Sequence, residues 1–453
     1  MPETLRRVLG PWSAASIVIG TIIGSGIFLV PTAMIAHVGS VKLVFVVWVV
    51  GGLLSLFGAL SYAELSAAMP EAGGEYVYLS EAYGPVWGFL YGWTQTWVAK
   101  SGSIASMATG FFYYAANFHP ELDQALCVVP LPLGPGGGPL EIRFGQLLAV
   151  AVIMGLAVVN YFGVKFGGGV QVAVTATKIG LLAAIIIIGL GSGRGNAANL
   201  ASSVPVPGGM AGFFAALVAA LWAYDGWNNL SMAGSEVKRP QRNLPLALIG
   251  GTLSAMGIYI AINLAYFCVL PAAAVASSDR VAAEMMRRIL GNPGAAAVSI
   301  AAMISIFAAL NGSILTGSRV PYAMARDGRF FRPIGKVNRA HGTPGVSILV
   351  LSAWASLLVF SGRYEQLFTY VIFASWILYG MTAAAVIVLR RKRPGLARPY
   401  RTPGYPLTPI LFVFGSFCVV LSTLINSPRE SLMGLVLIFS GLPFYAYWKR
   451  RAL

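Results

Sequence analysis

Two short runs of small and polar residues interrupt apolar segments that are otherwise typical of membrane-spanning helices. The first run is Gly24-Ser25-Gly26, and the second covers residues 222–228 (Trp-Ala-Tyr-Asp-Gly-Trp-Asn). A helix that unwinds at such a run leaves N–H groups free at the start of its second half and carbonyls free at the end of its first half. Because N–H groups bind a carboxylate and carbonyls bind an ammonium, two such breaks have the chemistry to hold a zwitterionic amino acid.

The first break supplies the candidate carboxylate site. We expect it to contact the substrate through five consecutive residues, mainly through their backbone: Ile23, Gly24, Ser25, Gly26 and Ile27. The alternative is helix packing, because Gly20 and Gly24 form a GxxxG pair that lets a neighbouring helix approach closely. The second break favours binding, since interruptions at corresponding places in two halves of a chain are typical of inverted-repeat transporters.

Side chains near the second break add specific chemistry. Trp222 offers an aromatic face that can cover a ligand, although it can equally be an ordinary core or lipid-facing residue. Ala223 and Tyr224 follow it as candidate binding residues. A carboxylate as deep as that of Asp225 is costly in a membrane, so it is a candidate for recognising a cationic side chain. Capping of the second half-helix by Asp225 is an equal alternative.

Two lysines lie inside apolar segments. Lys178 is about eight residues, or ~12 Å, inside its helix, too deep for its ammonium to reach the membrane surface easily. It can stand where an ion-coupled transporter holds its cation, titrate, or bind carbonyls freed by the break at Gly24. Lys100 is a weaker candidate of the same kind, and a purely structural role is favoured for it.

The cysteines and histidines are too scattered to form a reactive centre. Cys127, Cys268 and Cys418 have no disulfide or metal spacing, and the three histidines are isolated from one another. The sequence therefore predicts no metal, no cofactor and no enzymatic activity.

The elements that carry these residues are membrane helices. The 453 residues are 57% hydrophobic and only 10% charged, with a mean hydropathy of +0.74, so most of the chain must lie in lipid. The pattern predicts an all-α integral membrane protein with twelve helices. They are expected at residues 13–36, 42–68, 86–115, 144–161, 170–190, 211–235, 246–270, 295–322, 346–360, 364–389, 410–425 and 430–447.

These helices are expected to form one membrane transport domain over residues 1–453. Residues 11–190 would be the first inverted repeat and residues 211–390 the second, with the last two helices in residues 391–453. The two breaks then lie in the first and sixth helices, at similar depth and in opposite orientation, as a pair of inverted repeats requires.

Charge distribution predicts the orientation. The net charge is +16, and most of the 31 Lys and Arg residues lie at the termini and in loops that follow even-numbered helices. This positive-inside pattern places both termini in the cytoplasm. Lipid headgroups or nucleic acid are alternative partners for such basic clusters, but orientation accounts for them, and no nucleic-acid partner is expected.

Further motifs resemble the amino acid–polyamine–organocation superfamily, and within it the L-type amino acid transporter branch. The likeness extends over nearly the whole chain. Its motifs include Gly24-Ser25-Gly26-Ile27-Phe28, residues 223–228, Glu236, residues 242–245 (Arg-Asn-Leu-Pro), residues 61–65 (Ser-Tyr-Ala-Glu-Leu), residues 73–76 (Gly-Gly-Glu-Tyr), residues 323–328 (Ala-Met-Ala-Arg-Asp-Gly) and Thr343-Pro344. Each motif is moderately specific, and their order along one chain is highly specific.

The resemblance implies a five-plus-five inverted repeat with discontinuous first and sixth helices and two helices appended. It implies an aromatic gate at Trp222, where Phe is usual in this branch, and a lysine at position 178 in place of a sodium ion. It also places Tyr266 in the gating network, with packing an equal alternative, and it implies that the stretch Asn311-Gly312-Ser313 faces the site. Animal members form a disulfide to a glycoprotein subunit from the loop that holds Cys127, but the surrounding sequence matches poorly, so no heavy-chain subunit is expected.

We therefore expect a sodium-independent L-amino acid transporter of a bacterial inner membrane, most simply an exchanger that works by alternating access. A proton-coupled amino acid symporter in which Lys178 titrates is the nearest alternative. A membrane receptor that senses an amino acid is an alternative of a different class. The substrate side chain is not fixed by these residues.

Overall fold

Helices make up nearly the whole structure, a computed structural model that describes residues 4–130, 139–206, 208–278, 280–361 and 364–451. The helices of the first half are α1 (Pro11–Ile22), α2 (Gly26–Val38), α3 (Val41–Ala68), α4 (Glu75–Tyr83), α5 (Pro85–Thr94), α6 (Lys100–Ala115), α7 (Phe144–Tyr161) and α8 (Val164–Gly191). Those of the second half are α9 (Gly209–Tyr224), α10 (Asn229–Met232), α11 (Pro240–Val269), α12 (Ala272–Ala276), α13 (Val281–Leu290), α14 (Asn292–Gly317), α15 (Arg319–Arg326), α16 (Gly345–Val359), α17 (Tyr364–Lys392), α18 (Leu407–Asn426), α19 (Pro428–Phe439) and α20 (Gly441–Arg451).

The length of these helices confirms that the chain is a multi-pass membrane protein. Within the described residues, nine helical stretches are long and apolar enough to cross a membrane. Two shorter apolar helices, α9 and α16, stand at two further predicted positions. The predicted helix at residues 86–115 is divided into α5, a π-helical turn at Gln95–Ala99, and α6. The count of twelve spans and the inverted repeat stay predictions.

Two helices begin six residues earlier than expected. The sequence placed their starts at Val170 and Leu246, whereas α8 starts at Val164 and α11 at Pro240. Glycines occupy positions 167–169 in the first part of α8, and membrane helices use glycine for close packing. A Cβ on Gly168 would lie only 2.9 Å from Cδ2 of Leu9, so this glycine lets the N-terminal segment lie directly against α8.

Both predicted helix interruptions are present. Residues 23–25 separate α1 from α2, and residues 225–228 separate α9 from α10. The second break starts later than expected, because Trp222, Ala223 and Tyr224 still belong to the last turn of α9. The continuation of this helix is also short: α10 is only four residues long and is followed by a 3-10 turn at Gly234–Glu236.

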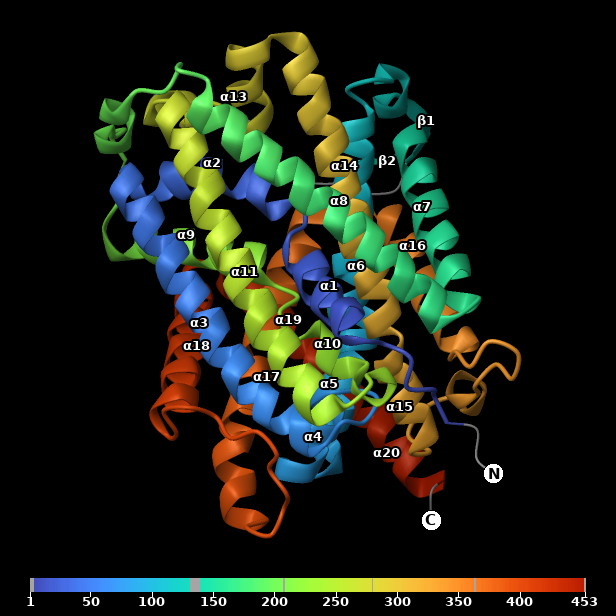
Figure 1. Cartoon of the computed structure of the whole chain (residues 1–453). Coiled ribbons are helices and arrows are strands. Elements are labelled where there is room, and N and C mark those ends of the chain that lie inside the picture. The colour runs from blue at the N-terminus through green and yellow to red at the C-terminus, as the bar shows by residue number, and fades with distance from the viewer. Residues whose placement is uncertain (1–3, 131–138, 207, 279, 362–363, 452–453) are drawn as a thin grey trace.

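The interrupted helices lie at the centre of the bundle. In Figure 1, α1 and α10 lie amid the other helices, while both chain termini lie at one end and the β1–β2 hairpin at the other. The α1–α2 and α14–α15 pairs are mostly buried, whereas α8 and the last helices expose many side chains. Helix α1 packs against α8, α11 and α14, and α2 packs against α9. The two breaks are therefore surrounded by protein rather than by lipid.

The hairpin carries the cysteine that was considered as a subunit attachment point. Strand β1 (Ala125–Val129) pairs in antiparallel register with β2 (Leu140–Arg143), with an irregularity between Ala125 and Cys127. Cys127 is exposed, and it forms no disulfide, nor do Cys268 and Cys418.

Candidate functional site

The break between α1 and α2 presents free backbone donors. The chain leaves the α1 helix at Ile23, and the Gly24 N–H turns back to the carbonyl of Ile22 at 2.9 Å. In the described part of the chain, the N–H groups of Ser25, Gly26 and Ile27 have no protein acceptor. No side chain caps the start of α2. Three donors at a helix N-terminus, where the helix dipole is positive, form a binding site for an anion such as a carboxylate.

The second break lies directly against the first. A Cβ on Gly26 would lie 2.9 Å from both Cα and Cβ of Ala223, so only glycine permits this approach. Gly226 has a φ of 104°, which favours glycine. Its carbonyl accepts a hydrogen bond from the Thr21 hydroxyl at 3.0 Å. Close contact between the two breaks therefore accounts for the glycines at positions 26 and 226. Gly20, by contrast, packs against Gln171 and Thr175 of α8.

A tyrosine of α11 joins the two breaks from behind. The buried Tyr259 hydroxyl lies 2.8 Å from the Ile22 carbonyl oxygen and 2.7 Å from that of Ala223, and it can donate to either. Its ring contacts those of Trp48 and Tyr224, each with centroids 5.0 Å away. The sequence analysis missed Tyr259, because an aromatic residue in an apolar helix carries no pattern that distinguishes it from core packing.

A small cavity of about 40 Å³ lies between the breaks. Six of the predicted binding residues line it: Gly24, Ser25, Gly26, Trp222, Ala223 and Asp225. Ile23, Ile27 and Tyr224 do not line it. Four polar side chains that the sequence analysis did not select also line it: Thr21, Ser103, Ser106 and Asn229. Ser313, from the stretch that the resemblance placed facing the site, lines it as well. The cavity is far smaller than the roughly 300–1,000 Å³ of pockets for drug-sized ligands. Its wall combines these polar groups with apolar side chains such as Ile22 and Met107.

Asp225 does not cap the second half-helix, so that interpretation is wrong. The residue before α10 is Asn228, and no side chain caps this helix. The Asp225 carboxylate instead accepts a hydrogen bond from the hydroxyl of Tyr379 in α17 at 3.0 Å. Asp225 lines the cavity and is only partly buried. A negative charge therefore stands at the carbonyl end of α9, on the side of the cavity suited to a cation.

Lys178 binds the carbonyls released by the first break. Its Nζ donates to the Gly20 carbonyl at 2.9 Å, the Ile23 carbonyl at 2.5 Å and the Ser305 carbonyl at 3.3 Å. The Ser305 hydroxyl also donates to Ile23 at 3.0 Å. The Lys178 side chain is buried, and no acidic group pairs with it in the described structure. Its ammonium thus joins α8, α1 and α14 at one point.

Lys100 belongs to a second buried polar group, on the other side of the second break. Its Nζ donates to Oδ1 of Asn229 at 2.6 Å. Nearby, the amide of Asn228 and the hydroxyl of Ser231 both donate to the carboxylate of Glu75, the first residue of α4. These contacts hold α10 to α4 and α6, which agrees with the structural role favoured for Lys100.

Asn311 and Tyr266 lie away from the cavity lining. Asn311 donates to Oε1 of Gln171 at 2.8 Å and accepts from the amide of Asn160 at 2.9 Å, so it joins α14 to α7 and α8. Of this stretch, Ser313 faces the cavity instead. Tyr266 is fully buried, and its hydroxyl has no hydrogen-bond partner in the described part of the chain. The gating roles predicted for Asn311 and Tyr266 stay predictions.

A buried ion pair joins the 3-10 turn after α10 to the start of α15. The carboxylate of Glu236 accepts hydrogen bonds from the guanidinium of Arg319 at 2.6 and 3.1 Å, and both side chains are fully buried. The Glu236 carbonyl accepts from the N–H groups of Val8 and Leu9, each at 2.9 Å. The N-terminal segment, the end of the α10 region and the start of α15 are thereby fastened together.

These features define a helical membrane protein with a polar cavity between two interrupted helices. Among the described residues, no three His, Cys, Asp or Glu side chains gather as a metal site would require. The chain belongs to the amino acid permease family, which it matches over residues 9–442. This finding confirms the resemblance to the amino acid–polyamine–organocation superfamily, a group of transporters rather than enzymes.

Individual relatives align along almost the whole chain. The serine/threonine exchanger SteT of Bacillus subtilis (strain 168) is 34% identical over 450 residues, which cover 99% of this chain and 98% of SteT. The human b(0,+)-type amino acid transporter 1 is 34% identical over 449 residues, covering 98% of this chain and 88% of the relative. The human cystine/glutamate transporter is 30% identical over 444 residues, covering 97% and 85%.

Proposed function

We propose that this protein is a sodium-independent L-amino acid transporter that exchanges one amino acid for another by alternating access. The observation that carries this proposal is the facing pair of breaks. One break offers three unpaired N–H groups, and the other offers the carbonyl end of α9 with the Asp225 carboxylate. The α-carboxylate and the α-ammonium of an amino acid need these two kinds of partner at a short separation.

The cavity wall favours a small neutral side chain. In the proposed pose, the carboxylate binds at Ser25, Gly26 and Ile27, and the ammonium binds near Asp225. The side chain then faces the hydroxyls of Ser103 and Ser106 on α6, which line the same cavity. A volume of about 40 Å³ leaves little room for a large side chain. The serine/threonine exchanger among the relatives supports this substrate class.

Lys178 supports sodium independence. Its ammonium already occupies the point where carbonyls from α1 and α14 converge, which is the kind of oxygen cluster that otherwise binds a sodium ion. A transporter without a coupled ion does not accumulate its substrate by itself, so exchange is the expected mode. The serine/threonine exchanger SteT among the relatives supports this mode.

The finer architecture is part of the same proposal. Ten of the twelve proposed helices form two inverted repeats of five, residues 11–190 and 211–390, with the last two helices in residues 391–453. This arrangement accounts for the positions of the two breaks. The positive-inside distribution of Lys and Arg residues supports a cytoplasmic location, at an inner membrane, for the ends of the chain, Glu236 and Arg319. We propose that the protein works without a heavy-chain subunit.

Reconstitution tests the proposal directly. Purified protein in liposomes is given labelled serine outside, with the lumen either empty or preloaded with unlabelled serine, in sodium-free buffer. We expect uptake only into preloaded vesicles, at a rate unchanged by added sodium. An absolute sodium requirement would overturn the interpretation of Lys178.

The same vesicles separate the competing functions. Uptake into empty vesicles that follows an imposed pH gradient would favour the proton-coupled symporter, with Lys178 as the titrating group. Binding of serine without any flux would favour a receptor. For the substrate class, excess unlabelled serine or threonine should compete with uptake, whereas phenylalanine and lysine should not.

A further inference from the structure

Two open grooves lie along α8 on the outside of the bundle, and the proposed transport site uses neither. The first groove has a volume of about 730 Å³ and lies at the end of the molecule that holds the chain termini. It is formed by the N-terminal segment, the junction of α7 and α8, and the loop before α16. Its charged and aromatic lining residues are Arg6, Phe162, Lys165, Phe166 and His341.

The charge of this first groove is one-sided. No acidic residue lines it. In the described structure, Arg6 and Lys165 are exposed and have no ion-pair partner. The stem of Arg6 lies over Gly342, with Cδ 3.4 Å from the place of a Cβ on that glycine. The first turn of α8 also lines this groove, and no side chain caps that helix. The groove is therefore complementary to an anion.

The remaining lining is apolar and open. Phe162 is 57% exposed and Phe166 is 58% exposed, although both belong to membrane helices or their junction. Exposed aromatic rings beside basic side chains are typical of the headgroup level of a bilayer. A free inorganic anion would use the basic groups but not these rings, whereas a phospholipid uses both.

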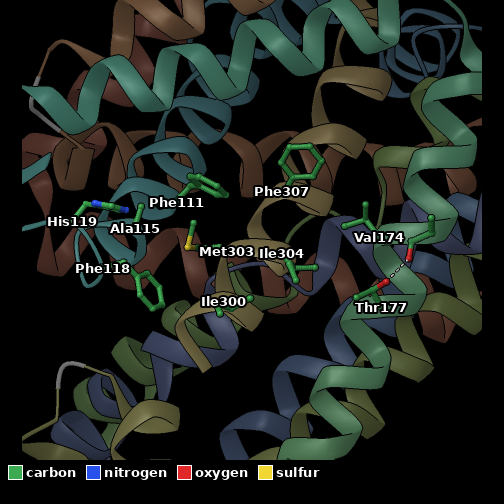
Figure 2. A pocket seen from close by; sticks show the side chains of 11 residues that line it. Phe111, Ala115, Phe118, His119, Val174, Thr177, Ile300, Met303, Ile304 and Phe307 are labelled. Carbon is green, nitrogen blue, oxygen red and sulfur yellow. Dashed lines mark hydrogen bonds between the residues drawn. The ribbon is translucent and has the colours of Figure 1, made fainter. Parts of the chain in front are cut away.

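The second groove continues the path along α8. It has a volume of about 670 Å³ and is almost wholly apolar. Figure 2 shows its side chains, which come from α6, the segment directly after α6, α8 and α14, with Phe111, Met303 and Phe307 around the open space. Ala173 lines both grooves, so they meet at this exposed residue.

The distance along α8 suits one leaflet. Lys165 and Ala173 are eight residues apart, or ~12 Å along the helix, and Thr177 in the second groove is ~18 Å from Lys165. Half of the hydrocarbon thickness of a bilayer is about 15 Å. An acyl chain whose headgroup lies at Lys165 therefore ends near the junction of the two grooves.

We propose that an anionic phospholipid of the cytoplasmic leaflet binds here, with its phosphate at Arg6 and Lys165 and an acyl chain along α8 to Ala173. The assignment of the leaflet rests on the orientation proposed above. The bound lipid connects the N-terminal segment, which is fastened to Glu236, with α8, which carries Lys178 on its buried side. The lipid thereby stabilises the arrangement in which the N-terminal segment lies against both Glu236 and α8.

Charge-matched variants test the headgroup site. The protein in detergent is titrated with phosphatidylglycerol or with phosphatidylcholine of the same acyl chains, and bound lipid is counted by native mass spectrometry. Arg6→Gln with Lys165→Gln should lower the affinity for phosphatidylglycerol about thirtyfold, since each basic residue near an anionic lipid contributes about fivefold. Lys336→Gln with Arg401→Gln removes two exposed charges outside the groove and should leave the affinity unchanged.

A second pair of variants tests the acyl-chain path without touching charge. Ala173→Trp fills the junction of the grooves and should weaken phosphatidylglycerol binding and abolish the rise in melting temperature that this lipid causes. Ala176→Trp places the same ring at an exposed position of α8 outside both grooves and should do neither. This pair remains informative if the Arg6 and Lys165 variants fail to fold.

Three results would overturn the proposal. Equal affinity for the two lipids would exclude recognition of the headgroup charge. The same stabilisation by inorganic phosphate alone would indicate a simple anion site. Unchanged lipid binding in Ala173→Trp would exclude the path along α8, leaving an acyl chain elsewhere. Each measurement is made without transport, so its outcome is independent of the proposed exchange activity.

Discussion

Lys178→Met is the change that tests the proposed mechanism most sharply. Methionine keeps the approximate length of the side chain but has no hydrogen-bond donor. The Ile23 carbonyl retains the Ser305 hydroxyl at 3.0 Å, whereas the Gly20 carbonyl has no other donor in the described structure. The break in α1 therefore loses the ammonium that joins it to α8, while the Ser305 hydroxyl of α14 still lies 3.0 Å from the Ile23 carbonyl and 3.2 Å from that of Gly24.

The size of the effect follows from the number of groups left unpaired. One buried carbonyl without a partner costs about 1–3 kcal/mol. This cost reduces the population of the arrangement that Lys178 stabilises by a factor of about 5–150. Removing the ammonium also removes the cost of burying it, so the melting temperature should change less than the exchange rate.

The assay is exchange of labelled serine in preloaded liposomes, with matched amounts of reconstituted protein. We expect the rate of Lys178→Met to fall by at least about fivefold. Lys42→Met makes the same chemical change at an exposed residue of α3 and serves as the control. Wild-type exchange by Lys178→Met would refute the reasoning, because the break would then hold its position without the ammonium.

Three further tests probe the contacts between the breaks and the buried ion pair of Glu236 and Arg319. Gly26→Leu forces the two breaks apart at a cost of about 1–3 kcal/mol and should abolish exchange. Ser25→Ala keeps the backbone donors and should reduce exchange only mildly. Equal effects of the two substitutions would argue against backbone recognition. Tyr259→Phe removes the hydroxyl between the breaks and should slow exchange about 5–30-fold with the protein still folded, so an unchanged rate would show that this link is dispensable. Arg319→Met leaves the Glu236 carboxylate buried without its partner and should destabilise the protein by about 3–5 kcal/mol in detergent melting. Adding Glu236→Gln should restore most of that stability. Purely additive effects of the two substitutions would contradict the pairing.

The sequence was informative wherever a residue type conflicted with its surroundings. Small and polar residues within apolar runs have few explanations in a membrane, and both breaks were located from them to within a few residues. Lys178 was identified for the same reason, since an ammonium deep in an apolar helix requires oxygen partners. Binding of Lys178 to carbonyls freed by the break was one of several alternatives, and the distances to the Gly20 and Ile23 carbonyls now show this contact.

Contacts between distant segments could not be predicted. Asp225 and its partner Tyr379 are 154 positions apart, and nothing near either residue indicates the other. Ser103 and Ser106 of α6 were missed because a serine in an apolar helix can bond its own backbone, so its type alone does not distinguish a cavity residue. Asn311 was assigned by resemblance to the correct helix, but the cavity residue of that stretch is Ser313.

The single proton of the Tyr259 hydroxyl has a consequence for the speed of transport. The hydroxyl lies within hydrogen-bond distance of the Ile22 and Ala223 carbonyls but can donate fully to only one of them at a time. When one half-helix moves away, the proton can remain with the other, so separation of the breaks does not leave this donor unsatisfied in a dry interior. A donor that can change partner in this way adds less to the activation barrier for separating the breaks than a donor that would be left unsatisfied.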